Sequence, residues 1–449
     1  MNDGPRRASL LVLFLTVFID LLGFGIVLPL LPIYADEMTD AKWLVGVLMA
    51  SFSAMQFLFS PLWGRISDRI GRRPVIMIGL AGSVVFYALF GYATWAKDMT
   101  LLFVSRIGAG IAGATIATAQ AYIADSTTMQ GRTKGMALIG AAFGLGFTFG
   151  PLVGLLAIPT GQGDPGPLPG LFAAGLSLLA LLLAAFKLPE SRQAREAGDR
   201  GHAWFQSAAL RSALGVPSVA MLLVASFVCV FSFGNFEATL SLLIRGTEHQ
   251  AAETVMPDAV APDAVETAEQ AVEDVGRSPA ARSGPFHFTF REVCLTFAFI
   301  GLTLTIAQGL IVRRLAGRLS DATLGGAGAL LEVVGFLYLN YAISQASASQ
   351  LFVALGVVVV GFSLMTPSIN ALISRRSDPE QQGGILGLLQ SANSLARILG
   401  PLIGVNLFYR DVQWPFYLAT VLMALGGLLV LAAARMGQDY TAPVASREA

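Results

Sequence analysis

Twelve long apolar runs follow one another along this chain of 449 residues. A helix needs about 20 apolar residues to cross the roughly 30 Å hydrocarbon layer of a bilayer. The runs therefore predict about twelve transmembrane helices in an all-α integral membrane protein. They lie near residues 9–34, 43–66, 74–95, 99–124, 134–158, 168–188, 217–244, 290–312, 324–345, 349–374, 384–409 and 414–435.

The composition supports the same fold class. Only 13% of the residues are charged, against about 25% in ordinary soluble domains, so much of the surface must face a lipid bilayer. The formal net charge of +0 argues against nucleic acid as a partner. The two cysteines, Cys229 and Cys294, both lie in apolar runs, where we expect small buried side chains. Their spacing fits no metal site or disulfide framework, and we expect no metal and no cofactor.

The N-terminal segment imitates a signal peptide, because Arg6 and Arg7 precede the apolar stretch from Leu10 to Ile19. The apolar run continues past Asp20, however, and no small-residue cleavage site ends it. We therefore interpret this segment as the first transmembrane span, retained in the protein.

Lysine and arginine gather in alternate connections, as the positive-inside rule requires of cytoplasmic loops. Both termini are then predicted to be cytoplasmic, in a multi-pass protein of the cell (cytoplasmic, or inner) membrane. The outer loops hold little beyond Lys42, Lys97 and Arg410. The inner connections hold Arg65, Arg69, Arg72, Arg73, Arg132, Lys134, Lys187, Arg192, Arg195, Arg200, Arg211, Arg313, Arg314, Arg318, Arg375, Arg376, Arg435 and Arg447.

Two connections are long enough to divide the chain. Residues 189–216 are charged and polar and are the natural cytoplasmic linker between an N-terminal six-helix bundle (1–188) and a C-terminal one (217–449). Residues 246–289 form an acidic insertion on the outer side, for which we expect disorder or a weak helix because its composition cannot bury a core. The acidic loop is either a solvated insertion without chemistry or an attractor of cations.

The two halves repeat short motifs at an offset near 250 residues. Gly64-Arg65-x-Ser67-Asp68 matches 317–321, and Gly150-Pro151-Leu152-x-Gly154 matches 400–404. Residues 121–131 more loosely match 371–383. Parallel repeats of six spans, related by an axis along the membrane normal, are a transporter architecture in which the substrate path lies between the halves.

Four motifs carry a resemblance to a known family. They are the run Gly64 to Arg73, Arg106-x3-Gly110, Gly140-x3-Gly144 with Gly146-x3-Gly150-Pro151-x2-Gly154, and Asp20-x2-Gly23-x-Gly25-x3-Pro29-x2-Pro32. On these residues the chain resembles the major facilitator superfamily, and within it the drug:proton antiporters of the tetracycline-efflux type. The resemblance implies two pseudo-symmetric six-helix bundles, a small-molecule substrate, protons as the coupling ion and a monomer.

The run from Gly64 to Arg73 has two interpretations. Gly64 and Gly71 would allow a tight turn, and Arg69, Arg72 and Arg73 would hold it at the cytoplasmic surface as a simple topology anchor. Asp68 is an acid that topology does not require. It would pair with an arginine or sit at a helix N-terminus and act as a conformational latch, with Asp321 as its counterpart in the second half.

The fifth span places Gly146, Gly150 and Gly154 on one face, and Pro151 removes a backbone donor. Small residues at this spacing let helix backbones approach closely. The face is either an ordinary packing surface or, as the resemblance implies, a helix-interface motif between the halves that limits leak.

Charged side chains inside a membrane are costly and usually functional. Asp20 lies in the middle of the first span and Glu332 in the ninth, each among apolar residues. A carboxyl group that exchanges protons there would couple transport to a proton gradient, and the resemblance implies that role for Glu332. Arg106 in the fourth span either reaches the membrane surface or, as the resemblance implies, orients a partner acid. A structural role remains open for each.

Further polar residues in the spans are candidates for the substrate path. Glu237 lies in the outer part of the seventh span and either lines the outer mouth or faces the headgroups. Neutral side chains either face the path or join helices to one another. The candidates besides Glu237 are Asn235, Gln120, Asn370 and Gln308, with Asn340 and Asn393 as further neutral side chains of this kind. The 29 phenylalanines and 13 methionines suit bulky amphipathic ligands, with lipid-facing filler as the alternative explanation for most of them.

The function favoured by these features is proton-coupled export of hydrophobic drug-like molecules, either tetracycline or several drugs, by alternating access. A solute importer or facilitator of the same fold and a non-transporting membrane sensor remain as alternatives. An enzyme is not expected, because the three histidines lie in loops and no zinc-protease or nucleophile-elbow motif occurs. The chain also lacks the glycine-rich phosphate loop of ATP-driven proteins.

Overall fold

The computed structural model describes residues 4–127, 129–158, 165–191, 215–245, 284–315, 318–377 and 382–437. Most of the predicted linker (192–214), most of the acidic insertion (246–283) and Gly317 lie outside the described residues.

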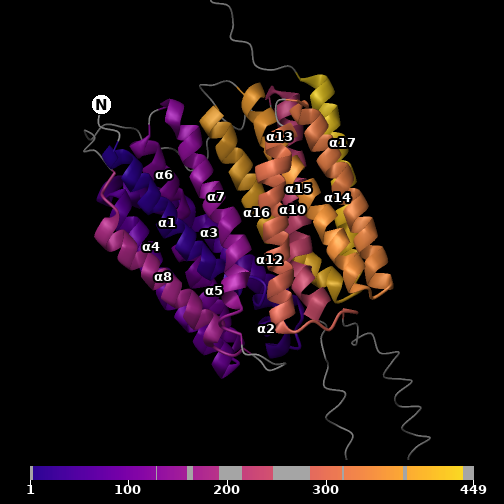
Figure 1. Cartoon of the computed structure of the whole chain (residues 1–449), viewed down its shortest axis with the longest axis horizontal. Helices are drawn as coiled ribbons and strands as arrows, with labels where there is room; N and C mark the ends of the chain where they lie inside the picture. The colour runs from indigo at the N-terminus through magenta and orange to yellow at the C-terminus, as the bar shows by residue number, and fades with distance from the viewer. Residues whose placement is uncertain are drawn as a thin grey trace, which may run out of the picture.

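The described helices make twelve spans in two groups, which confirms the predicted fold class (Figure 1). The first group comprises α1 (Gly4–Val27), α2 (Leu31–Met38), α3 (Trp43–Ile70), α4 (Arg72–Ala96), α5 (Met99–Gly113), α6 (Ile116–Ser126), α7 (Met129–Gly154) and α8 (Leu168–Lys187). The second comprises α10 (Pro217–Arg245), α12 (Phe290–Ile306), a π-helical segment (Ala307–Val312), α13 (Arg313–Leu315), α14 (Asp321–Ser344), α15 (Ala348–Arg376), α16 (Gln382–Phe408) and α17 (Trp414–Met436). Ten of the described spans are apolar and long enough to cross a membrane by themselves.

Two spans of the first half are interrupted, which the apolar runs did not predict. α1 ends before Pro29, whose missing N–H cannot continue the helical hydrogen bonding. The fourth span divides at Ala114 and Thr115, where the Thr115 hydroxyl donates to the Ala112 carbonyl at 3.0 Å. A hydroxyl that bonds to its own backbone competes with the regular helix and often bends it.

Each group packs mainly on itself. α1 contacts α7 and α8, and α4 contacts α5 and α8; in the second group α10 contacts α16 and α17, and α14 contacts α15 and α17. The groups meet where α3 packs on α16 and α7 packs on α12. Figure 1 shows the indigo-to-magenta helices on one side and the orange-to-yellow helices on the other.

The two copies of the Gly-Pro motif make equivalent contacts. A Cβ on Gly150 would lie 2.6 Å from the Gly25 Cα, so α7 and α1 touch backbone to backbone. A Cβ on Gly400 would lie 2.9 Å from the Asn235 backbone nitrogen, so α16 approaches α10 in the same way. The repeat seen in the sequence therefore produces one close helix pair in each half.

The last residues of the acidic insertion are neither disordered nor helical, contrary to expectation. Phe286 is buried, and the Phe288 amide donates to the Ile244 carbonyl at 2.9 Å. Thr289 then caps α12 through the backbone N–H of Glu292. These residues are apolar, unlike the acidic part of the insertion, and so they pack against the end of α10.

Candidate functional site

A cavity of about 410 Å³ lies between the two groups of helices. Its walls come from both halves and are largely apolar and rich in aromatic rings, with four charged side chains among them. The aromatic rings include Phe24, Phe52, Phe143, Phe147, Phe233, Phe236, Phe297 and Phe362, and the charged side chains are Asp20, Arg106, Glu237 and Arg397. Such a wall suits a bulky, mostly apolar ligand with a few polar groups.

Asp20 lines the cavity from α1. Its carboxylate accepts a hydrogen bond from the Ser177 hydroxyl of α8 at 2.6 Å, and Ser83 of α4 lies beside it. The side chain is therefore held by neutral hydroxyl groups and remains open to the cavity. This geometry agrees with a carboxyl group that can exchange a proton with the cavity.

Arg106 lines the same wall from α5 and is only 2% exposed. Its guanidinium carbon lies 4.6 Å from the centre of the Phe52 ring and 5.9 Å from that of Phe24. The structure thus excludes the first interpretation from sequence, in which Arg106 extends to the membrane surface.

The opposite wall carries a charged pair. Glu237 of α10 and Arg397 of α16 both line the cavity, and their charges attract one another. Glu237 therefore faces the interior and not the headgroups. Arg397 was missed in the sequence analysis, although a lone arginine inside an apolar run is a recognisable signal.

Glu332 is fully buried in α14 and is not among the residues that line the cavity. Both of its carboxylate oxygens lack a hydrogen-bond partner among the described residues. It packs against Gly361 of α15, and its charge acts on the neighbouring Cys229. The Cys229 sulfur lies 3.8 Å from the hydroxyl of Thr366, which does line the cavity. Glu332 is thus set back from the cavity behind Cys229 and Thr366.

The neutral candidates divide between two environments. Asn370 lines the cavity, whereas Gln120 and Gln308 are exposed residues outside its lining. Asn235 is fully buried, and its amide donates to the Pro415 carbonyl at 2.7 Å. Asn235 therefore joins α10 to α17 and does not reach the path.

The glycine face of α7 has partners in both halves. Gly146 and Gly150 pack against α1, within the first half. Gly154 lies near Ile26 and near Cys294 of α12. α7 also contacts the second half through Thr148, whose hydroxyl lies 3.1 Å from the Thr305 hydroxyl.

The halves are joined at one end of the molecule, which we call the outer end after the predicted topology. There Tyr409, just after α16, donates a hydrogen bond to the Asp36 carboxylate of α2. Lys42 pairs with the same carboxylate at 2.7 Å. The Tyr34 and Phe290 rings stack across the halves, 6.0 Å apart. These contacts join the halves at that end, and neither Asp36 nor Tyr409 was singled out in the sequence.

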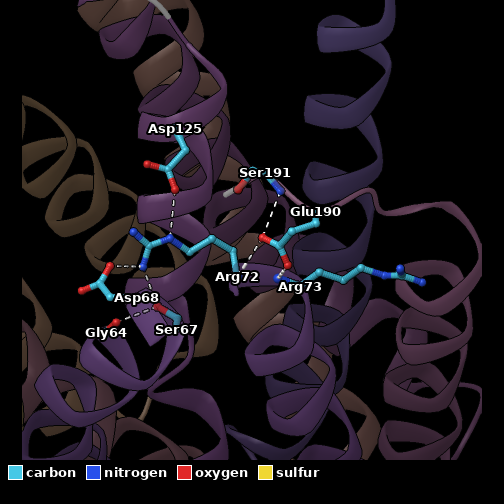
Figure 2. A network of polar contacts seen from close by, with 8 residues as sticks. All are labelled: Gly64, Ser67, Asp68, Arg72, Arg73, Asp125, Glu190 and Ser191. Atoms are coloured by element: carbon cyan, nitrogen blue, oxygen red, sulfur yellow. Dashed lines mark hydrogen bonds and ion pairs between the residues drawn. The ribbon is translucent and has the colours of Figure 1, made fainter. Parts of the chain in front are cut away.

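At the opposite, inner end, the run Gly64 to Arg73 forms an ion network within the first half (Figure 2). Arg72 pairs with Asp68 at 2.7 Å and with Asp125 at 2.9 Å, and it donates to the Ser67 hydroxyl at 2.6 Å. Asp68 is thus paired with an arginine of its own motif. Arg69 is largely exposed.

The predicted turn is correct at Gly71 and wrong at Gly64. Gly71 has a φ of 108°, which L side chains rarely adopt, and separates α3 from α4. Gly64 lies inside α3, because the helix continues to Ile70. The position where its side chain would be is open space.

A different acid from the one expected sits at a helix N-terminus. Glu190 accepts hydrogen bonds from the backbone amides of Arg72 and Arg73, at 2.9 and 3.1 Å (Figure 2). These are the first amides of α4, where an anion is favoured by the orphan donors and the helix dipole. The Arg73 guanidinium donates to the Ala185 carbonyl. The first residues of the predicted linker therefore fasten α8 to α4.

The second half contains a simpler counterpart. Asp321 pairs with Arg375 of α15, at 3.1 Å. Arg375 is 250 residues beyond Asp125, so the internal repeat places an ionic contact at the same point in each half.

The comparisons with known proteins agree with this architecture. The model of the Major Facilitator Superfamily matches residues 13–261 and 267–449. The class E tetracycline resistance protein of Escherichia coli is 30% identical over 403 residues, covering 89% of this chain and 88% of that protein. Multidrug resistance protein 1 of Bacillus subtilis (strain 168) is 28% identical over 430 residues, covering 95% and 96%.

A solved structure extends the comparison to three dimensions. The human organic anion transporter MFSD10 (TETRAN) has 26% sequence identity and a TM-score of 0.64, with 95% of this chain and 99% of that chain covered. The twelve-span fold, the cavity between the halves and a family match over nearly the whole length lead to one conclusion: this chain is a multi-pass membrane protein that belongs to the Major Facilitator Superfamily of transporters.

Proposed function

We propose that the protein is a proton-coupled secondary active transporter that exports hydrophobic drug-like molecules by alternating access. The observation that carries this proposal is the aromatic cavity between the halves, which contains the carboxyl group of Asp20. Relatives named for tetracycline and multidrug resistance support export as the direction of transport.

The positions of the interhalf contacts support alternating access. Asp36, Lys42 and Tyr409 close the outer end. At the inner end, the contacts of Arg72 and of Asp321 each stay within one half. This arrangement suits a state that takes up substrate from the cytoplasm, with both termini on that side of the cytoplasmic membrane. Opening the outer end requires the Tyr409–Asp36 contact to break.

Two carboxyl groups are proposed to couple transport to protons. Asp20 lies in the cavity, so substrate and proton can compete there directly. Glu332 lacks compensating partners among the described residues, and an ionised carboxylate in such a place is costly. A proton would reach it from the cavity past Thr366 and Cys229 as the helices move. Protons would move inward down their gradient as substrate moves outward.

The ion network at the inner end is proposed to act as the conformational latch. Asp68, Arg72 and Asp125 hold α3, α4 and α6 together in the present state. Asp321 and Arg375 hold α14 to α15 in the second half. Closing the inner end brings the two networks toward one another, and their pairing then biases the equilibrium between the states.

Vesicles containing the purified protein test this function. A pH gradient is imposed, and tetracycline or ethidium is added on the side that corresponds to the cytoplasm. We expect drug-dependent proton release that an uncoupler abolishes. Drug movement that is unaffected by the gradient would instead support a facilitator. A strain that expresses the chain, profiled for drug resistance with and without an uncoupler, then defines the range of substrates.

A further inference from the structure

Arg106 is a buried cation that the rest of the protein leaves without an ionic partner. Its side chain is 2% exposed and lines the cavity, and its Nε and Nη1 atoms have no hydrogen-bond partner among the described residues. Burying a charged donor without a partner is costly, and the free energy of folding must offset that cost. Such a residue is expected to have a partner in some functional state.

Two other arginines in or near the space between the halves have partners. Arg397 faces Glu237 across its wall of the cavity. At the outer end, Arg245 lies 4.5 Å from the Phe290 ring but donates to the Phe288 carbonyl. In the described part of the chain, no ion pair is formed by Arg106. Arg73 and Arg376 each have an unsatisfied Nε but donate to backbone carbonyls through another nitrogen, whereas Arg106 has two unsatisfied nitrogens.

The residues around Arg106 form a site that could bind an anion. Gly110 follows Arg106 by one helical turn, and a Cβ there would meet the Phe52 carbonyl oxygen at 2.5 Å. This close approach of α5 to α3 brings the Phe52 ring to 4.6 Å from the guanidinium carbon. Stacking on an aromatic face stabilises the cation through its flat surface. The Nε and Nη1 atoms of the guanidinium have no partner among the described residues and are covered by the surrounding protein in this state, so an anion with two oxygens would pair with them once that cover moves aside.

The acid on the same wall does not fill this role. Asp20 is held by Ser177, and it forms no ion pair with Arg106 among the described residues. The cavity therefore offers a proton-exchanging group and a fixed cation at two separate positions.

We propose that Arg106 binds the anionic group of the transported molecule, so that the preferred substrates are aromatic or polycyclic compounds bearing a carboxylate or a similar delocalised oxyanion. The inference deepens the proposed export function and depends on the cavity being the substrate site. The oxyanion pairs with the guanidinium edge, and the rings of the ligand pack against Phe24, Phe52 and the other aromatic side chains.

Equilibrium binding of a matched pair of probes tests the proposal. The probes are pyrenebutyrate and its neutral amide, which share one aromatic body and differ in charge. Binding to the full-length purified protein is followed by pyrene fluorescence in detergent, without any proton gradient. We expect the acid to bind about tenfold or more tightly than the amide, which is the scale of one charge-assisted hydrogen bond in a dry site.

Substitutions then assign the preference to one residue. Arg106→Gln should abolish the preference for the acid while leaving the affinity for the amide unchanged, which also shows that the variant is folded. Arg106→Lys should retain part of it, because an ammonium keeps the charge and loses the planar fork. Arg245→Gln is the matched control, since it removes an arginine on an aromatic ring outside the cavity, and it should leave both affinities unchanged.

Three results would overturn the inference. The first is equal binding of acid and amide by the unmodified protein, and the second is no binding of the acid at all. The third is a preference that survives Arg106→Gln and disappears in Arg397→Gln, which would place the anion on the opposite wall. Failure of the export proposal has a different signature: vesicles then show no drug-dependent proton release although the Arg106-dependent preference persists.

Discussion

Tyr409, at the end of α16, donates a hydrogen bond to the carboxylate of Asp36, in α2 of the other half. Asp36 is buried, and Lys42 donates to it from its own half. The Tyr409 phenol thus links the two halves, and we call this hydrogen bond the tie. Lys42, in contrast, belongs to the same half as Asp36 and only holds its carboxylate in place. Because the tie lies at the outer end, the proposed alternating-access cycle requires it to open once per cycle.

Replacing Tyr409 with phenylalanine should therefore favour the state that is open to the outside. Losing one hydrogen bond to a charged group shifts such an equilibrium by about tenfold or more. The measurement is the rate at which an external thiol reagent labels Met49→Cys, a cavity position, in a protein lacking Cys229 and Cys294. Tyr417→Phe is the control, because among the described residues that phenol bonds only to Gln413, the residue just before α17. Equal labelling rates in both variants would show that the tie does not hold the outer end closed.

Asp20→Asn should abolish drug-dependent proton release in vesicles. Asparagine keeps the size of the side chain and can still accept from Ser177, but it cannot exchange a proton. Ser177→Ala is the companion variant, since it removes the donor and keeps the carboxyl group, and it should retain proton release. Normal coupling in Asp20→Asn would remove this residue from the proton path and contradict the proposed role.

Glu332→Gln should also abolish proton-coupled export, with one difference from Asp20→Asn. Glu332 lies outside the cavity lining, so the affinity for a transported drug should remain unchanged. Binding and transport are measured on the same purified preparation, and membrane insertion is checked by fractionation. Normal transport by this variant would place the coupling site elsewhere, with Asp20 the remaining candidate.

Asp68→Asn should slow transport and leave the thermal stability nearly unchanged. The Asp68 side chain is 61% exposed, and exposed ion pairs contribute about 0–1 kcal/mol to stability. A role as a latch, in contrast, affects the rate of exchange between states. Turnover and melting temperature are compared with those of Asp40→Asn, an exposed acid at the outer end. Unchanged turnover in Asp68→Asn would reduce the motif to a topology anchor.

Gly150→Ala should destabilise the protein by about 1–3 kcal/mol, the usual cost of overpacking a tight contact. The new Cβ would lie 2.6 Å from the Gly25 Cα, and two helix backbones cannot yield as a flexible side chain would. Gly144→Ala on the same helix is the control, because nothing lies within 4 Å of its Cβ position. The comparison uses thermal unfolding in detergent, and equal melting temperatures would contradict the prediction.

The spans were predictable because the bilayer fixes their length and apolar character. The last predicted span, 414–435, differs from α17 (Trp414–Met436) by one residue. The paired motifs at Gly150 and Gly400 also indicated two similar halves before any contact was known. The turn at Gly64 was not predictable in the same way, since a glycine is tolerated inside a helix as well as in a turn.

The polar residues show what sequence alone left open. Asn235 and Glu237 are two positions apart in one helix, which places them about 200° apart around its axis. Glu237 therefore faces the cavity while Asn235 bonds to Pro415 in α17. Hydropathy identifies both as costly residues in a membrane but does not say which face of α10 meets the other half.

The sequence by itself determined the membrane environment, the number of spans, the duplicated halves and the acids worth testing. These depend on local composition and spacing, which the hydrocarbon thickness constrains directly. The tertiary structure decided which side chains meet: Arg106 with Phe52, Glu237 with Arg397, and Tyr409 with Asp36. Such pairs join residues up to 373 positions apart, and only helix rotation and packing, set by the whole bundle, bring them together.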